Sequence, residues 1–131
     1  MIFVDTGAWF AFLVSDDPLH SQARTWVKQN RDVLVLSDYV LDETLTLLRM
    51  RNQHKHAFTF GDEIFKGELA ELIYLNADII EEAWEVFQRY NDKGWSFTDC
   101  TSKVLMERMQ ITTAFAFDHH FRQFGTITVV P

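Results

Sequence analysis

Four acidic side chains lie directly after short apolar segments or in the first or second turn of expected helices. Two of them follow the apolar residues 2–4 and 113–117. Carboxylate oxygens, in a chain whose single cysteine cannot build a thiolate cluster, suit hard divalent cations better than Zn²⁺. The set therefore predicts a Mg²⁺ or Mn²⁺ site with hydrolytic chemistry. Its members are Asp5, Glu43, Asp99 and Asp118.

Helical spacing distinguishes Glu43 from its neighbour Asp42. On the expected helix, Glu43 shares a stripe with Tyr39, Val40, Leu47 and Met50, whereas Asp42 shares one with Asp38, Thr46, Arg49 and Gln53. The first stripe is apolar and predicts that Glu43 points inward. A cation is its natural partner there, because an unpaired buried charge is very costly.

Each acid alone also has an ordinary structural explanation. Asp118 could form a turn, Asp99 could complement a helix dipole, and Glu43 could pair with a nearby cation. The functional interpretation depends on all four lying at one edge of one sheet.

The elements that would position these acids alternate along the chain. Apolar strands are expected at residues 2–4, 33–36, 72–75, 113–117 and 127–130. Helices are expected at residues 8–14, 16–30, 38–54, 57–65, 78–90 and 98–109, with Ser37 and Thr98 as N-caps of two of them. This alternation predicts an α/β fold whose parallel sheet is covered on both faces. The functional crevice of such a sheet lies beyond the carboxyl ends of its strands.

Composition limits the classes of protein that fit. The chain has 131 residues, which suits one domain, and a net charge of -7, which disfavours a plain nucleic-acid-binding module. The single cysteine, Cys100, excludes an intramolecular disulfide and fits a reducing compartment. No signal peptide and no apolar run long enough to cross a bilayer are evident, so we expect a cytoplasmic protein without membrane contact.

The segments around the acids resemble those of PIN-domain ribonucleases, and of the VapC-like toxins of bacterial toxin–antitoxin pairs in particular. The matching segments are residues 2–9, 37–44, 95–100 and 115–121, in the family's order across the whole chain. The resemblance implies a single PIN domain over residues 1–131, with a five-stranded parallel sheet between helices. It also implies RNA as the substrate, a cognate antitoxin as a partner and a homodimer.

The same resemblance implies that Asp5, Glu43, Asp99 and Asp118 bind one or two Mg²⁺ or Mn²⁺ ions. We expect Asp5 and Asp99 to be the principal ligands. Glu43 and Asp118 would complete the site, and one of them would hold the attacking water. Thr6 matches a small hydroxyl residue that supports this site.

Four other residues near these segments could have a functional or a structural role. Arg122 either contacts a substrate phosphate or pairs with Asp118 four residues earlier. His119 and His120 are adjacent, so they cannot serve one ion from a regular helix, and we expect surface or capping roles for them. Cys100 near a helix start is expected to be a small buried residue.

Two other functions could also use an acidic α/β domain of this size. A receiver-like signalling domain would carry an acid pair after its first strand and an Asp after its third, but Asp5 stands alone and Asn76 follows residues 72–75. A PIN fold that acts only as a binding or regulatory module, without nuclease turnover, is the second alternative. The presence of all four acids favours the metal-dependent endoribonuclease.

Overall fold

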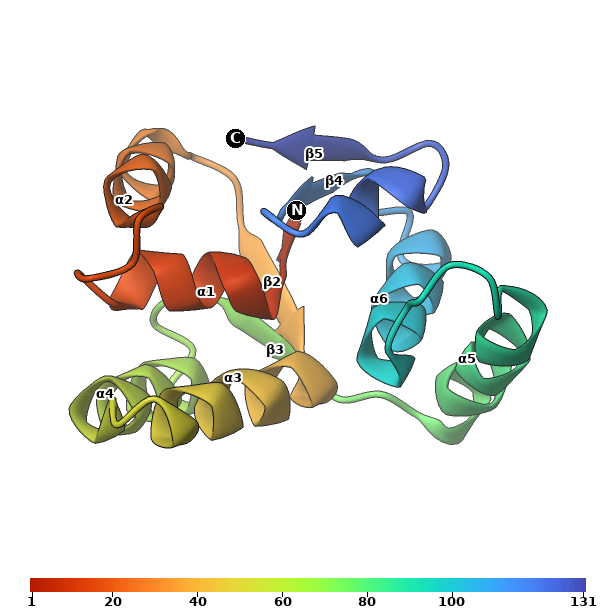
Figure 1. Cartoon of the computed structure of the whole chain (residues 1–131), viewed down its shortest axis with the longest axis horizontal. Helices are drawn as coiled ribbons and strands as arrows, with labels where there is room; N and C mark the ends of the chain where they lie inside the picture. Colours follow the sequence, from red (N-terminus) through yellow and green to blue (C-terminus); the bar gives the residue numbers. More distant parts are fainter.

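Five parallel strands form one sheet at the centre of the computed structural model, which describes all 131 residues (Figure 1). The strands are β1 (Ile2–Val4), β2 (Leu34–Ser37), β3 (Glu71–Ile73), β4 (Thr113–Phe115) and β5 (Thr128–Val130). Their order across the sheet is β3-β2-β1-β4-β5, and every pairing is parallel. The expected α/β fold with a five-stranded parallel sheet is confirmed.

Helices follow the strands and cover the sheet. They are α1 (Thr6–Leu13), α2 (His20–Gln29), α3 (Asp38–Met50), α4 (His54–Phe65), α5 (Ala77–Arg89) and α6 (Phe97–Arg108), with a 3₁₀ helix η1 (His119–Gln123) before β5. In Figure 1, α1 and α2 lie to the left of the strands, α3 and α4 lie below them, and α5 and α6 lie side by side on the right. No helix is both long and apolar enough to span a membrane.

The core lies along the central strand and its neighbours. All three residues of β1 are buried, and Phe3 and Val4 are fully so, without the alternation of a half-exposed strand. This pattern is typical of a strand covered on both faces. The core continues into the helices through Trp9 of α1 and Phe60 of α4, whose rings pack 5.1 Å apart.

Several expected helix boundaries were wrong, for local reasons. The N-cap of α6 is Ser96 rather than Thr98, because Ser96 and Asp99 form a reciprocal capping box. Helix α3 ends at Met50 because Asn52 adopts a left-handed conformation with φ of 58°. The N-cap of α5 is Asn76, whose side chain accepts from the N–H of Ile79.

Strand β4 ends at Phe115, two residues earlier than expected. The backbone N–H of Ala116 still donates to Val130 of β5, but Phe117 and Asp118 lie in a loop that leads into η1. Asp118 therefore does not follow the strand directly. It reaches the carboxyl edge of the sheet as the N-cap of the 3₁₀ turn.

Candidate active site

One pocket of about 410 Å³ is lined by all four acids from the sequence analysis. Asp5 comes from the end of β1, Glu43 from the second turn of α3, Asp99 from the first turn of α6 and Asp118 from the loop before η1. Thr6, Gly7, Leu47, Gly94, Ser96 and His120 complete the lining. Four segments that are remote in the sequence thus bring their carboxylates to one edge of the sheet.

Asp5 is the most deeply buried of the four acids at 5% exposure. Its backbone N–H donates to Phe115 at 3.1 Å, so the residue is held between β1 and β4 before α1 begins. The pKa of this carboxyl is raised from 3.8 to about 8, mainly by burial and next by the negative charge of Asp99, while the backbone N–H of Thr6 has a smaller lowering effect. Glu43 and Asp118 add smaller contributions in the same direction.

Glu43 is partly buried and faces the pocket from α3. Burial raises its pKa, a hydrogen bond with the Thr6 side chain opposes that rise, and the charges of Asp99 and Asp118 add to it. The hydroxyl of Thr44 donates to the Thr6 hydroxyl at 3.4 Å, which leaves the Thr6 hydrogen free for Glu43. Thr6 thus connects α1 with α3 at the pocket wall.

The stripes expected for α3 were only partly right. Met50 was placed on the inward side with Glu43, but it is 75% exposed because α3 ends there. Asp38 was placed on the solvated side, but it is half-buried and accepts the N–H of Leu75 at 3.1 Å. Asp42 is exposed, as expected.

Asp99 is buried, and one of its oxygens is already engaged. Its Oδ2 accepts the backbone N–H of Ser96 at 3.1 Å, while the Ser96 hydroxyl accepts the N–H of Asp99 at 3.0 Å. This capping box fixes both the start of α6 and the direction of the carboxylate. Thr98 contributes only its carbonyl, which accepts from Thr101 and Ser102.

His120 lies in the same pocket, and the sequence analysis missed it. Its Nδ1 lies 3.1 Å from Oδ2 of Asp99 and 3.4 Å from Oδ1 of Asp118. The same Asp118 oxygen accepts the backbone N–H of His120 at 3.0 Å. An Asp at the start of a tight turn accepts the backbone N–H of the residue two positions later and so keeps that residue close to its carboxylate. The Asp118-x-His120 spacing could therefore have placed His120 in the site from the sequence.

The expectation that adjacent histidines cannot serve one ion was made for a regular helix, but residues 119–123 form a 3₁₀ helix instead. In the 3₁₀ turn, one potential ligand atom each from Asp118, His119 and His120 lies within 4.8 Å of the others. The His119 side chain is nevertheless 75% exposed, against 19% for His120. Only His120 lines the pocket with the acids.

Arg122 does not line this pocket. It is exposed on η1, and it makes no ion pair with Asp118. Of its two interpretations, pairing is therefore wrong, and contact with a substrate phosphate stays a prediction.

The chemistry of the pocket fits a divalent cation. Its lining supplies carboxylate oxygens but no Lys or Arg side chain to balance their charge. Ionised Asp5 in particular needs a nearby positive charge, since burial and Asp99 raise its pKa. A small hard cation with oxygen ligands meets that need, and the four acids that line the pocket are its candidate ligands.

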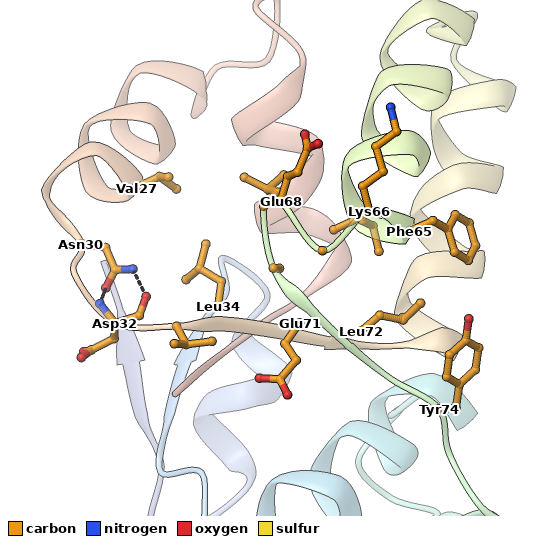
Figure 2. A pocket seen from close by; sticks show the side chains of 15 residues that line it. Val27, Asn30, Asp32, Leu34, Phe65, Lys66, Glu68, Glu71, Leu72 and Tyr74 are labelled. Carbon is orange, nitrogen blue, oxygen red and sulfur yellow. Dashed lines mark hydrogen bonds between the residues drawn. The ribbon is translucent and has the colours of Figure 1, made fainter.

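A larger cavity of about 780 Å³ lies elsewhere (Figure 2). It is bordered by the ends of α2 and α4 and by β2 and β3, and it contains none of the four acids. Figure 2 shows apolar side chains such as Leu34 and Leu72 within it, while Asn30 and Asp32 bond to each other at its margin. Its charged groups do not converge, so it offers no comparable chemistry.

Comparisons with known proteins agree in family, sequence and shape. The family model described as PIN domain matches residues 2–127. The chain is 35% identical over 131 residues to the 23S rRNA-specific endonuclease VapC20 of Mycobacterium tuberculosis, covering 100% of this chain and 99% of the relative. It is 30% identical over 125 residues to the VapC ribonuclease of Archaeoglobus fulgidus, covering 90% of this chain and 77% of that one.

A solved structure extends this similarity to the fold. The crystal structure of VapC20 from Mycobacterium tuberculosis, described as a sarcin–ricin loop cleaving toxin, matches with a TM-score of 0.92 and 34% identity. The match covers 100% of both chains.

Proposed function

The chain belongs to the PIN-domain family, and from that premise we propose that it is a VapC-like endoribonuclease, the toxin of a toxin–antitoxin pair. The observation that carries this function is the single pocket in which four carboxylates meet without a balancing Lys or Arg. Such a pocket suits phosphodiester hydrolysis assisted by Mg²⁺ or Mn²⁺.

Each acid has a distinct part in the proposed reaction. Asp5 and Asp99 are the principal ligands, and Glu43 and Asp118 complete the site. When bound, the cation supplies positive charge to the phosphate and lowers the pKa of water. The Thr6 side chain holds Glu43 at the pocket wall, and we assign Glu43 the role of orienting the attacking water and accepting its proton.

The names of the relatives indicate which RNA to test first. VapC20 is named for 23S rRNA, and its structure for cleavage of the sarcin–ricin loop. We take that loop as the first RNA substrate for this chain. A cognate antitoxin, a homodimer and a cytoplasmic location belong to the same proposal.

Two neighbouring acids on α3 provide a matched test. Purified wild-type protein is incubated with a sarcin–ricin loop RNA in Mg²⁺, in Mn²⁺ and in EDTA. We expect cleavage with either ion and none in EDTA. Glu43→Gln should lose cleavage, whereas Asp42→Asn, which changes an exposed acid outside the pocket, should keep it.

Two outcomes would contradict the proposal. Cleavage that persists undiminished in EDTA would exclude the metal site. A folded wild-type protein that cleaves neither this loop nor total RNA with either ion would favour the binding module without turnover.

A further inference from the structure

We infer that His120 is a positioning residue that orients Asp99 and Asp118, so that each keeps a free oxygen directed to the divalent cation. The inference rests on the proposed metal-dependent function. It concerns a residue outside the set of four acids, and it follows from the hydrogen bonds around two of them.

The donors around Asp99 are unequally divided between its two oxygens. Oδ2 lies 3.1 Å from the backbone N–H donor of Ser96 and 3.1 Å from Nδ1 of His120. An ionised carboxylate only accepts, so Nδ1 carries the hydrogen in this contact. Oδ1 of Asp99 has no protein donor in the structure and is left for a cation.

Asp118 shows the same division. Its Oδ1 accepts the backbone N–H of His120 at 3.0 Å and lies 3.4 Å from Nδ1 of the same residue. His120 therefore contacts one oxygen of each acid. It joins the start of α6 to η1 across 21 positions of sequence.

Phe121, the next residue along the chain, anchors the backbone of His120 to the core. Phe121 is fully buried and stacks on Phe3 of the central strand with ring centroids 6.2 Å apart. It also packs against Phe124 at 4.7 Å. The imidazole is thus presented from a turn anchored in the core. Groups that orient metal ligands in this way typically change metal affinity about 10–100-fold when removed.

Two amide substitutions at position 120 test whether the hydrogen-bond donor must lie where Nδ1 of His120 lies. The amide nitrogen of Asn can take the place of imidazole Nδ1, whereas the longer Gln carries its amide further from the backbone. His120→Asn and His120→Gln therefore differ in where they put the same chemical group. His119→Gln is the matched control, because the exposed His119 lies 3.5 Å from the same oxygen of Asp118 but, unlike His120, makes no ion pair with Asp99.

The measurement is Mn²⁺ binding to the RNA-free protein, from the electron paramagnetic resonance signal of free Mn²⁺. We expect His120→Gln to weaken binding by about 10–100-fold. The Mn²⁺ affinity of His120→Asn should stay within about threefold of wild type, because the Asn amide replaces the hydrogen bond to Asp99. His119→Gln should have the smallest effect, and circular dichroism and Tm should show that all variants fold.

The outcomes separate this inference from the proposed function. Equal weakening by Asn and Gln at position 120, or no weakening by either, would overturn the positioning role while leaving the nuclease intact. An effect of His119→Gln as large as that of His120→Gln would also overturn it. A wild-type protein that binds no Mn²⁺ would instead remove the metal site on which both ideas rest.

Discussion

Asp5→Asn should make the metal-free protein more stable at neutral and alkaline pH while abolishing its proposed activity. The carboxyl of Asp5 is buried beside Asp99, and its pKa is raised from 3.8 to about 8. Asparagine has nearly the same shape and keeps an oxygen that accepts the N–H of Thr6. It cannot ionise, so it removes the cost of placing a negative charge in this pocket.

The pKa of Asp5 sets the magnitude and the pH range of this effect. A pKa difference of one unit corresponds to about 1.4 kcal/mol, so ionising Asp5 inside the metal-free fold costs up to about 6 kcal/mol. Because the folded pKa is raised, the associated stability is fully present below about pH 4, declines as pH rises and is lost above about pH 8. Water entering the pocket relieves part of this cost, and we expect about 2–4 kcal/mol.

The assay is urea unfolding of wild type and Asp5→Asn in EDTA, at several values between about pH 4 and about pH 8. The two free energies of unfolding should agree at the acidic end and diverge as pH rises. At the alkaline end the variant should have a Tm higher by roughly 10 °C. Saturating Mn²⁺ should then stabilise wild type much more than the variant.

One result would refute this reasoning. If the free energies of unfolding of both proteins followed the same curve with pH in EDTA, Asp5 would not be the buried carboxyl that opposes folding. A loss of stability in Asp5→Asn across the whole range would contradict it equally. The electrostatic account of the pocket would then fail, whatever the effect of the variant on cleavage.

Four further predictions concern single residues in and around the pocket and in the core. Thr6→Val removes the hydroxyl beside Glu43 and leaves the buried Thr44 hydroxyl without its acceptor, so we expect RNA cleavage to fall about tenfold and the free energy of unfolding to fall by about 1–3 kcal/mol. Arg122→Ala should raise KM for RNA a few-fold and leave kcat unchanged if this exposed side chain contacts phosphate; an unchanged KM would dismiss that role. Ser37→Ala removes the N-cap that accepts from Val40 and should cost about 1 kcal/mol in urea unfolding. Cys100 is buried with its pKa raised to about 11, so a thiol reagent at about pH 8 should label it only on unfolding, and rapid labelling of the native protein would contradict this.

Much of the fold could be predicted because local and global signals agree in it. Ile2–Val4 and Leu34–Ser37 are short apolar runs followed at once by helical patterns, which only a parallel sheet accommodates well. The Ser37 cap was right because a hydroxyl stands alone before an amphipathic helix. The convergence of the acids at one edge then followed from parallel topology.

The features that could not be predicted depend on where helices begin and end and on local backbone geometry. Ser96 and Thr98 are both suitable caps, and the choice was decided by Asp99 reaching back to the N–H of Ser96. His120 was missed because its role depends on the 3₁₀ geometry of η1, which a helical stripe cannot represent. Met50 was misplaced because Asn52 ends the helix with a positive φ.

The central position of β1 has a consequence for biosynthesis. Its first residues are translated early, but one of its two neighbours, β4, is made only when residue 115 is added. Closing so long a loop is a late step in folding. A nascent chain therefore carries Asp5, Glu43 and Asp99 on the ribosome without the strand and turn that bring Asp118 and His120 to them. Chains that end before β4 lack two of the residues that line the pocket, and we expect them to have no metal-dependent nuclease activity.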